Sequence, residues 1–260
     1  MELGSVAIYR RRIRASLARV WENVHDWEHL PWLHHQSFSA IGLDEAGDFG
    51  WRARIGLRAA GDPEIRLELV RDGELAYVSR TLEGLGAGSE IWTRLSPRGA
   101  DTDIEVEFLL PGVAPGRRDD VGRGYVALYT QLWDQDEAMM QRRALLLGAK
   151  TRAPGAPPEP LDLGPLAELE GRLPLRVAFG GRPVAVVRDA GELVAFDALC
   201  PHLLGPLDEG AIEDGLVVCP WHGYAYDLRS GAGCGAAKHL KLAAAPKVEI
   251  AAGRVWLVPA

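Results

Sequence analysis

The sequence predicts an α+β protein with two domains, a mixed N-terminal domain and a small all-β C-terminal domain. Residues 151–160, TRAPGAPPEP, hold four prolines and therefore form a semi-rigid linker that is neither helix nor strand. Before this linker, strand-like segments alternate with helical patterns, whereas only short β patterns follow it. We therefore expect domains at residues 1–150 and 161–260, joined by the linker at 151–160.

In the first domain, residues 5–14 alternate as a strand does, and residues 15–25 have helical spacing with Ser16 as the N-cap. Antiparallel strands separated by turns follow, and a helix of unusual length ends the domain. We expect these strands at residues 49–57, 64–71, 74–82, 88–97 and 101–110, and the final helix at 119–147.

The second domain contains short β segments on both sides of two Cys/His loops. Glycine-containing turns separate the segments, as in a small β module that carries its metal loops at one end. The expected strands are residues 173–179, 184–188, 193–197, 247–251 and 254–258.

Composition limits the classes of function. The 260 residues are 47% hydrophobic and 25% charged, with a net charge of −7. This acidic balance argues against nucleic-acid binding and suits docking to a basic or mixed-charge redox partner. No apolar run is long enough for a membrane span, and residues 1–5 do not begin an apolar signal core, so we expect a cytoplasmic protein.

Two short boxes carry the clearest chemistry. Cys200 and His202 form the first, and Cys219 and His222 form the second. Two Cys and two His can hold a zinc ion or a [2Fe–2S] cluster. Each box mixes the two residue types, whereas structural zinc sites usually pair like with like.

The pattern C-x-H followed by C-P-x-H-G and an aromatic-Asp tail resembles the Rieske box. That resemblance implies a [2Fe–2S] cluster with both Cys on one iron and both His on the other. Gly205 and Trp221 stand where respiratory Rieske proteins have a disulfide, and Tyr224 replaces a serine that donates to a cluster sulfide. Fewer such hydrogen bonds lower the reduction potential, as in the Rieske centres of oxygenases and their ferredoxins.

Two further positions bear on the second domain. The family favours glycine where this chain has Leu204, so we expect the first cluster loop to follow a slightly different path. Cys234 lies beyond both boxes and is expected to be a free thiol. With two cysteines assigned to iron, no pair remains for a structural disulfide, which fits a reducing compartment.

The first domain offers a second candidate metal site. Asn23, Asp26, His29 and His34 match N-x-x-D-x-x-H-x-x-x-x-H, which resembles the mononuclear-iron motif of Rieske non-haem iron oxygenases. The resemblance implies that His29 and His34 are ligands in a triad of two His and one carboxylate, with open positions for O₂. The alternative is a solvated rim or a pocket lining rich in histidine.

The spacing of the two histidines places a condition on the backbone. Residues five apart on an unbroken helix lie about 140° apart around its axis and cannot meet one metal. Pro31 disfavours helix at Leu30, so we expect a break between His29 and His34. Asp26 lies three residues before His29 and suits acceptance of its ring N–H. The resemblance further implies that Asp26 bridges to the cluster ligand His222.

The third ligand is expected from the terminal helix. Residues 133–141 resemble the acidic helix of the family, whose Asp or Glu completes the triad. Asp136 is our first choice, and Asp134 and Glu137 are the alternatives. The competing interpretation is that acidic residues on a long helix are simply solvated. The order of strand, helix, several strands and long helix resembles the helix-grip fold of the START-like (SRPBCC) superfamily, which encloses an apolar cavity.

The resemblance implies a Rieske-type non-haem iron oxygenase that hydroxylates or demethylates an apolar or aromatic small molecule with O₂. Its cofactors are the [2Fe–2S] cluster and a mononuclear iron, and its electrons come from a ferredoxin or flavin reductase. The family places the Rieske domain first, whereas this chain reverses the order. Family members form trimers, so a homotrimer is one expectation, and transfer within or between chains stays open.

The alternative is a Rieske electron-transfer protein fused to a START-like ligand-binding domain without mononuclear iron. A third hypothesis is a regulatory protein that uses the cluster as a redox sensor.

Overall fold

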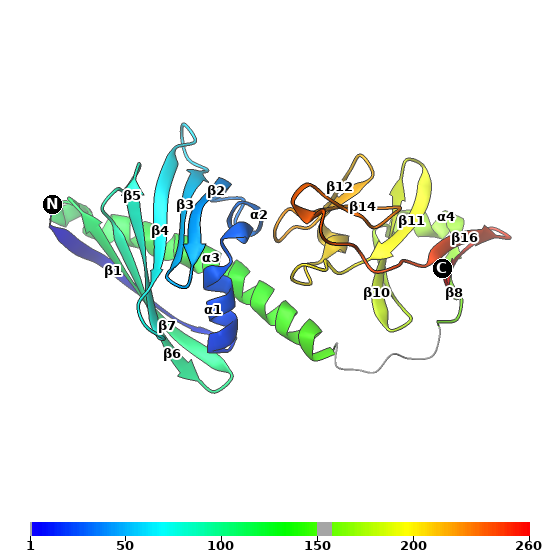
Figure 1. The fold of residues 1–260 in the computed structure, drawn as a ribbon, viewed down its shortest axis with the longest axis horizontal. Helices are drawn as coiled ribbons and strands as arrows, with labels where there is room; N and C mark the ends of the chain where they lie inside the picture. Colours follow the sequence, from blue (N-terminus) through cyan, green and yellow to red (C-terminus); the bar gives the residue numbers. More distant parts are fainter. Residues whose placement is uncertain (1, 150–157) are drawn as a thin grey trace. The chain divides into compact units, whose positions relative to one another are not determined.

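The computed structural model describes residues 2–149 and 158–260 (Figure 1). The chain divides into two compact units, Met1–Ala144 and Leu145–Ala260. This division falls within the last helix of the first unit, a few residues before the predicted boundary at 150. Most of the predicted linker at 151–160, namely residues 151–157, lies outside the described residues.

In residues 2–149, seven antiparallel strands form one sheet in the order β1-β7-β6-β5-β4-β3-β2. Strands β2 to β7 form a meander in chain order, and β1 pairs with β7 at one edge of the sheet. The strands are β1 (Leu3–Ile13), β2 (Phe38–Gly47), β3 (Gly50–Leu57), β4 (Glu64–Arg71), β5 (Ala76–Glu83), β6 (Glu90–Arg98) and β7 (Asp101–Pro111).

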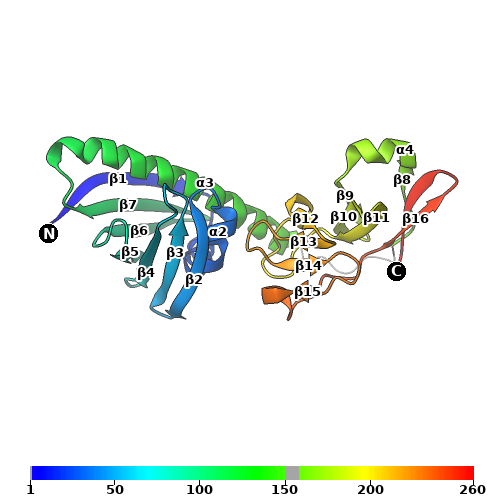
Figure 2. The same cartoon turned by 90° about the horizontal axis from the view of Figure 1, so that it is seen from above.

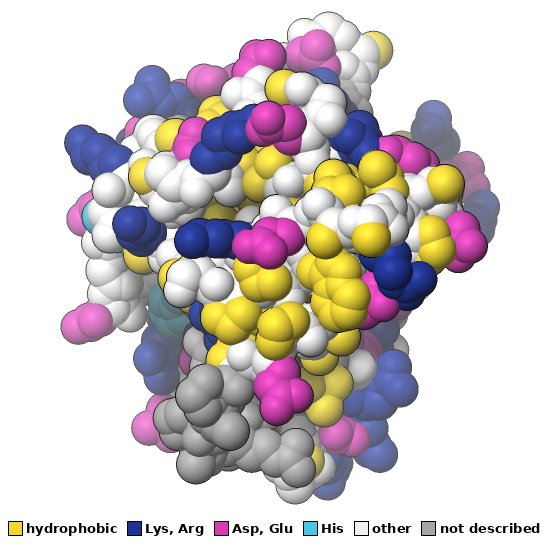
Figure 3. Space-filling view, turned by 90° about the vertical axis from the view of Figure 1, so that its right-hand side faces the viewer, with side chains coloured by type: hydrophobic (Ala, Val, Ile, Leu, Met, Phe, Trp, Pro, Cys, Tyr) yellow, Lys and Arg dark blue, Asp and Glu magenta, His cyan; other side chains and the backbone are white. Residues whose placement is uncertain are grey.

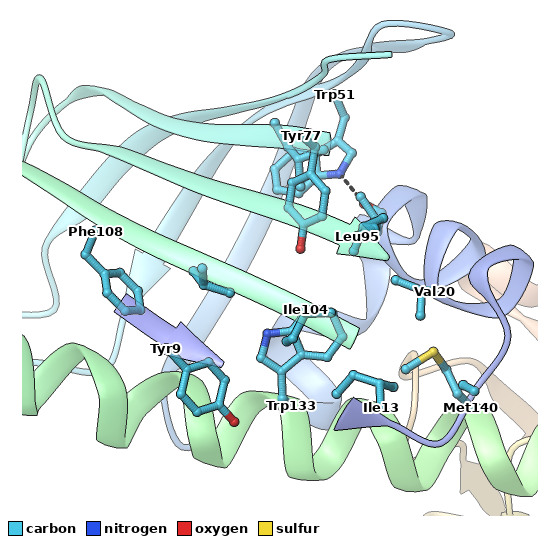
Figure 4. Close-up of a cluster of buried hydrophobic side chains, with 14 of the residues drawn as sticks. Tyr9, Ile13, Val20, Trp51, Tyr77, Leu95, Ile104, Phe108, Trp133 and Met140 are labelled. Atoms are coloured by element: carbon cyan, nitrogen blue, oxygen red, sulfur yellow. Dashed lines mark hydrogen bonds between the residues drawn. The ribbon is translucent and has the colours of Figure 1, made fainter. Parts of the chain in front are cut away.

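The long helix α3 (Arg118–Ala149) lies along one face of this sheet (Figure 2). Strand β7 shows why the sheet has an inner face, because every second residue from Thr102 to Leu110 is buried. On α3, Tyr129, Trp133 and Met140 recur at helical spacing and pack into the same core. Figure 4 shows Trp133 and Met140 directed from α3 toward the sheet. This is the predicted helix-grip arrangement, and the α+β class is confirmed.

Helix α1 (Leu17–His25) begins as expected, since the Ser16 side chain accepts a hydrogen bond from the Arg19 N–H. The expected break at Pro31 is wrong. A 3₁₀ turn, η1 (Trp27–His29), is followed directly by the short helix α2 (Leu30–Leu33), and Leu30 is helical. Pro31 lies in the first turn of α2, where a missing N–H leaves no intrahelical bond unmade. The chain leaves helical geometry earlier, at Asp26.

Strand β2 was not predicted. It is mostly exposed and carries several charged or small residues, so its apolar alternation is weak. Burial changes toward the end of α3. Met139 and Met140 are buried, whereas the apolar Leu145 side chain is 76% exposed.

The C-terminal unit consists of three small antiparallel sheets, β11-β10-β9, β12-β13-β14-β15 and β16-β17-β8, within residues 158–260. Val184, Val186 and Val255 belong to its core. Its strands are β8 (Leu161–Pro165), β9 (Leu175–Phe179), β10 (Arg182–Asp189), β11 (Glu192–Asp197), β12 (Ala211–Glu213), β13 (Leu216–Val218), β14 (Ala225–Asp227), β15 (Gly233–Cys234), β16 (Lys247–Ala251) and β17 (Arg254–Val258).

A short helix, α4 (Leu166–Leu169), follows β8. The five strands expected in this unit correspond to β9, β10, β11, β16 and β17. The face drawn in Figure 3 mixes hydrophobic and charged side chains, with hydrophobic ones gathered near its centre. In the described part of the chain, no helix is long and apolar enough to cross a membrane.

Candidate metal centres

Three buried side chains of the first unit bring potential metal-ligating atoms together. His29, His34 and Asp136 each offer one such atom, and these atoms lie within 4.8 Å of one another. The Nε2 atoms of His29 and His34 are 3.5 and 3.1 Å from Asp136 Oδ1. The two imidazole rings meet edge to face with centroids 5.0 Å apart. A buried carboxylate with two imidazoles is the donor set that suits a divalent transition metal.

The short helix α2 brings the two histidines together although it is not broken at Pro31. His29 is its N-cap and His34 its C-cap, so the two histidines flank one short helix, and His34 has already left helical geometry with φ −102° and ψ 32°. The spacing expected for an unbroken helix therefore does not apply at His34. Asp136 reaches the same point from α3, because it follows Trp133 by three residues and precedes Met140 by four on the buried stripe.

Asp136 Oδ1 provides a test of whether these residues fit a cation. This oxygen is buried and accepts no hydrogen bond from the residues that the structure describes, although both Nε2 atoms face it. A buried carboxylate oxygen without a donor is costly, and a bound cation removes that cost. The residues present therefore fit a metal ion.

A hydrogen bond fixes the ring orientation of His34, and the ring of His29 faces a carboxylate. Nδ1 of His34 lies 2.7 Å from Gln135 Oε1, and His29 Nδ1 lies 3.7 Å from Asp26 Oδ2. A ring whose Nδ1–H donates to the amide oxygen presents its unprotonated Nε2 to the metal. Asp26 occupies the side of His29 that the sequence analysis expected, but the helix ends at Asp26 and does not continue to His29.

The other two acidic candidates on α3 are turned toward arginines of β1 and its end. Asp134 accepts a hydrogen bond from Arg11, and Glu137 accepts from both Arg11 and Arg14. Burial alone would raise the pKa of Glu137, but the hydrogen bonds from Arg14 and Arg11 outweigh it and lower the pKa. These carboxylates tie α3 to the sheet, and of the three acidic candidates only Asp136 joins the histidines.

A cavity of about 150 Å³ adjoins the triad. Most of its wall is apolar and comes from the inner face of the sheet and from α3. Trp51 and Tyr77 point into this space from the sheet (Figure 4), and the Trp51 indole N–H donates to the Val24 carbonyl. Trp51 thus lines the cavity. Trp92 does not line it, and its indole N–H donates to Glu90.

In the C-terminal unit, the two predicted boxes form loops with the same backbone pattern. In the first, Leu204 N–H donates to Cys200 O, and in the second, Gly223 N–H donates to Cys219 O, both at 2.9 Å. Leu204 and Gly223 have positive φ values of 66° and 68°. The altered path expected at Leu204 is therefore not observed. Its left-handed conformation costs about 1–2 kcal/mol, which burial of the leucine side chain offsets.

The four predicted cluster ligands lie at the tips of these loops. Cys200 and Cys219 are fully buried and hydrogen-bonded to each other through sulfur. The His202 and His222 rings lie 4.7 Å apart at their centroids. The shared hydrogen bond lowers the pKa of Cys200 to about 6 and raises that of Cys219, so one thiolate forms readily here. Two sulfurs and two imidazoles are the donor set of a [2Fe–2S] centre with mixed ligation.

Gly205 and Trp221, the positions without a disulfide, pack on each other instead. A Cβ added to Gly205 would lie 2.6 Å from Cys219 Sγ and 3.2 Å from the Trp221 ring. Only a glycine therefore permits this approach of the two loops. The buried indole of Trp221 packs over the glycine. This packing joins the two cluster loops at the positions where respiratory Rieske proteins have a disulfide.

Tyr226 is a functional residue that the sequence analysis missed. Its hydroxyl lies 3.2 Å from Cys200 Sγ, and its side chain is fully buried. A buried tyrosine hydroxyl needs a polar partner, so a Tyr two residues after Tyr224 could have been recognised as a sulfur donor. Backbone N–H groups also reach the sulfurs, from His202 to Cys200 and from Trp221 to Cys219. Tyr224 stands in the sequence where the family has a serine, and its ring stacks on the His202 ring with centroids 4.4 Å apart.

The arginine pairs make Glu137 a stability determinant. The Glu137 side chain is 4% exposed, so Glu137→Gln should destabilise the first unit by about 2 kcal/mol at pH 7 by leaving buried charge unpaired. Because the folded-state pKa is lowered, this stabilisation is complete above the unfolded pKa and is lost as pH falls through the folded pKa. Urea unfolding followed from pH 7 to pH 3 measures both effects.

Asp134→Asn is the matched control, since Asp134 shares Arg11 but its side chain is 60% exposed. It should change the free energy of unfolding by less than about 1 kcal/mol. Equal losses in the two variants would contradict the structural role assigned to Glu137.

Comparisons with known proteins agree with the loop geometry. Residues 159–246 match the Rieske [2Fe-2S] domain model. A 4beta-methylsterol monooxygenase of Methylococcus capsulatus is 43% identical over 75 residues, which are 27% of this chain and 19% of that protein. An anthranilate 1,2-dioxygenase ferredoxin subunit of Burkholderia cepacia is 41% identical over 70 residues, 27% of this chain and 65% of that protein.

Two solved structures complete the comparison. The ferredoxin of carbazole 1,9a-dioxygenase from Nocardioides aromaticivorans aligns over 39% of this chain and 99% of its own, with 27% identity and a TM-score of 0.36. A START superfamily protein from Mycobacterium smegmatis aligns over 52% of this chain and 99% of its own, with 16% identity and a TM-score of 0.44. The chain spans less than two thirds of the two curated relatives described above. From the sequence match and the two Cys/His loops, we conclude that residues 159–246 are a Rieske [2Fe–2S] domain, through which the chain is related to Rieske ferredoxins and oxygenases.

Proposed function

We propose that this chain is a Rieske-type non-haem iron oxygenase that acts on an apolar or aromatic small molecule. The observation that carries the proposal is the convergence of His29, His34 and Asp136 beside a mostly apolar cavity. An electron-transfer protein has no need of a second set of buried metal-ligating atoms. A pure ligand carrier has no need of a carboxylate placed between two imidazoles in its cavity wall.

Each residue set has a defined role in this proposal. Cys200, Cys219, His202 and His222 hold the cluster, and the triad holds one iron. When bound, the cluster supplies single electrons and the iron supplies the capacity to activate O₂. Gln135 orients the His34 imidazole through a hydrogen bond, as outer partners of metal ligands do, and the Asp26 carboxylate lies 3.7 Å from His29 Nδ1. The apolar cavity wall limits access of water to the reacting atoms.

The remaining expectations for this activity are part of the proposal. Electrons come from a ferredoxin or flavin reductase, and O₂ is the co-substrate. A contact between Asp26 and His222, within one chain or between chains of a homotrimer, stays the predicted link between the two centres. The competing function is a Rieske electron carrier fused to a ligand-binding domain, which the similarity to a ferredoxin subunit favours.

Iron analysis and O₂ consumption together separate the two functions. The loaded chain should contain one iron more than the two of its cluster and should consume O₂ when supplied with a reductase and an accepted substrate. His29→Ala should lose that extra iron and the O₂ consumption, because a ligand is removed, while the visible spectrum of the cluster persists.

His35→Ala is the control, because His35 is exposed and lies outside the triad. It should retain both the extra iron and the O₂ consumption. Wild-type protein that holds only the cluster irons and consumes no O₂ would establish the electron carrier instead.

Gln135 should affect the metal without touching it. Gln135→Leu keeps the approximate size of the side chain but removes the acceptor for His34 Nδ1–H, so the ring loses its fixed orientation. We expect Fe(II) or Co(II) affinity at the triad to fall by about 10- to 100-fold. Equilibrium titration with Co(II), followed by its visible absorption, measures this.

Gln131→Leu is the matched control, since Gln131 lies on the same helix and bonds the exposed Gln36. Its metal affinity should equal that of the wild type. A similar loss in both variants would point to a general disturbance of α3 instead of ring positioning.

Tyr226 should tune the cluster potential. A hydroxyl that donates to Cys200 sulfur stabilises the more negative reduced state, so Tyr226→Phe should lower the reduction potential. A loss of about 1 kcal/mol corresponds to about 40 mV for one electron. Redox titration followed by circular dichroism measures the shift. An unaltered electron paramagnetic resonance spectrum of the reduced variant would show an intact cluster, and an unchanged potential would contradict the role of the hydroxyl.

A further inference from the structure

The cavity beside the triad is small, and its size limits what it can hold. Its volume of about 150 Å³ is lined by side chains of α1, the sheet and α3 and is partly open to solvent. A cavity of about 150 Å³ accommodates one benzene-sized molecule. The second ring of a fused two-ring compound would have to stay in the open side or displace the packed side chains of Trp51 and Trp133, and such core rearrangements are costly.

The charges along the wall select against anions. Apart from the neutral phenols of Tyr77 and Tyr129, the ionisable side chains on the lining are the carboxylates of Asp26 and Asp136 and the imidazoles of His29 and His34, and the described lining contains no Lys or Arg. With a divalent metal bound, the two carboxylates balance its charge. No net positive charge therefore remains to compensate the desolvation of a carboxylate or phosphate on a ligand.

Outside the metal triad, one further buried polar atom on the lining lacks a hydrogen bond from the described residues. Asn23 lies at the cavity wall, is 8% exposed, and its Oδ1 accepts no hydrogen bond from any described residue. An unpaired buried acceptor is destabilising, and a ligand that brings an O–H or N–H donor removes that cost. The side-chain amide therefore points to a hydrogen-bonding substituent on the ligand.

Strand β5 adds a row of hydroxyls to the same wall. Tyr77, Ser79 and Thr81 alternate along β5 and all line the cavity. Burial raises the pKa of Tyr77, so its phenol stays neutral and available as a donor. These hydroxyls give the otherwise apolar wall one polar strip, which can contact a neutral oxygen or nitrogen of a ligand.

We propose that the substrate is a small uncharged compound of about one aromatic ring with a hydroxyl or amino substituent whose N–H or O–H donates to Asn23 Oδ1. This inference rests on the proposed oxygenase function for the meaning of "substrate", but the binding selectivity can be measured without turnover. It makes Asn23 a residue that determines specificity, and it assigns the β5 hydroxyls to the same polar end of the cavity.

Isothermal titration of the full metal-loaded chain with four probes tests this selectivity in the absence of reductant. Phenol is the matched ligand, anisole lacks the donor, benzoate adds a charge, and 1-naphthol adds a ring. Phenol should bind about five- to tenfold more tightly than anisole, the effect of one neutral hydrogen bond. Benzoate and 1-naphthol should bind at least about tenfold more weakly than phenol.

The variant Asn23→Leu removes the acceptor and keeps the approximate volume. It should abolish the difference between phenol and anisole, because only the donor distinguishes their interaction with residue 23. Thr130→Val is the control, since Thr130 is exposed on α3 and bonds Val126 O outside the cavity. It should retain the wild-type preference.

Equal binding of phenol, anisole and benzoate, or no binding of phenol to metal-loaded protein, overturns this inference. A preference for phenol over anisole that persists in Asn23→Leu also overturns the role of Asn23. Failure of the proposed function has a different signature. In that case the triad binds no iron and O₂ is not consumed, while the same titration of the chain that holds only its cluster still shows the preference for a neutral one-ring donor.

Discussion

The first unit depends on how a buried carboxylate is accommodated between α3 and the sheet. Asp136 lies on the apolar stripe of α3 that packs against β7 and its neighbours. A carboxylate in that position must find positive charge or hydrogen-bond donors. The structure supplies two imidazoles from the opposite side, at the two ends of α2. The packing that makes the helix-grip core thus also builds the site, and its donor set fits a cation.

The second unit must likewise accommodate buried charge, here on the cysteine sulfurs. Its two loops repeat one hydrogen-bonding pattern, and each uses a left-handed residue to turn a Cys toward the other loop. Gly205 allows the loops to approach, and Trp221 covers the contact. The tyrosine hydroxyl and backbone N–H groups around the sulfurs then offset the negative charge of the thiolates. The loop geometry and its charge balance therefore depend on each other.

The elements that could be predicted from sequence were those with a strong local signal. Alternation identified β7, the Ser16 cap located the start of α1, and the Cys/His boxes identified the cluster loops. Where local signals were weak or ambiguous, prediction failed. Strand β2 lacks clear alternation, and Pro31 was interpreted as a break because its position in the first turn of α2 depends on where the preceding helix ends. Leu145 looked like core but lies beyond the part of α3 that the sheet covers.

By itself, the sequence determined the α+β class, the cluster chemistry of the second domain and a short list of metal candidates, since these depend on residue type and spacing along one chain. Only the tertiary structure decided which acidic residue of α3 meets the histidines. Asp134 and Glu137 are as acidic as Asp136, but the arginines of the first strand region bind them. The size of the cavity and the unmatched Asn23 oxygen were likewise decided by the fold. Such features arise from side chains that are distant in sequence, and no local pattern specifies which of them will share one enclosed space.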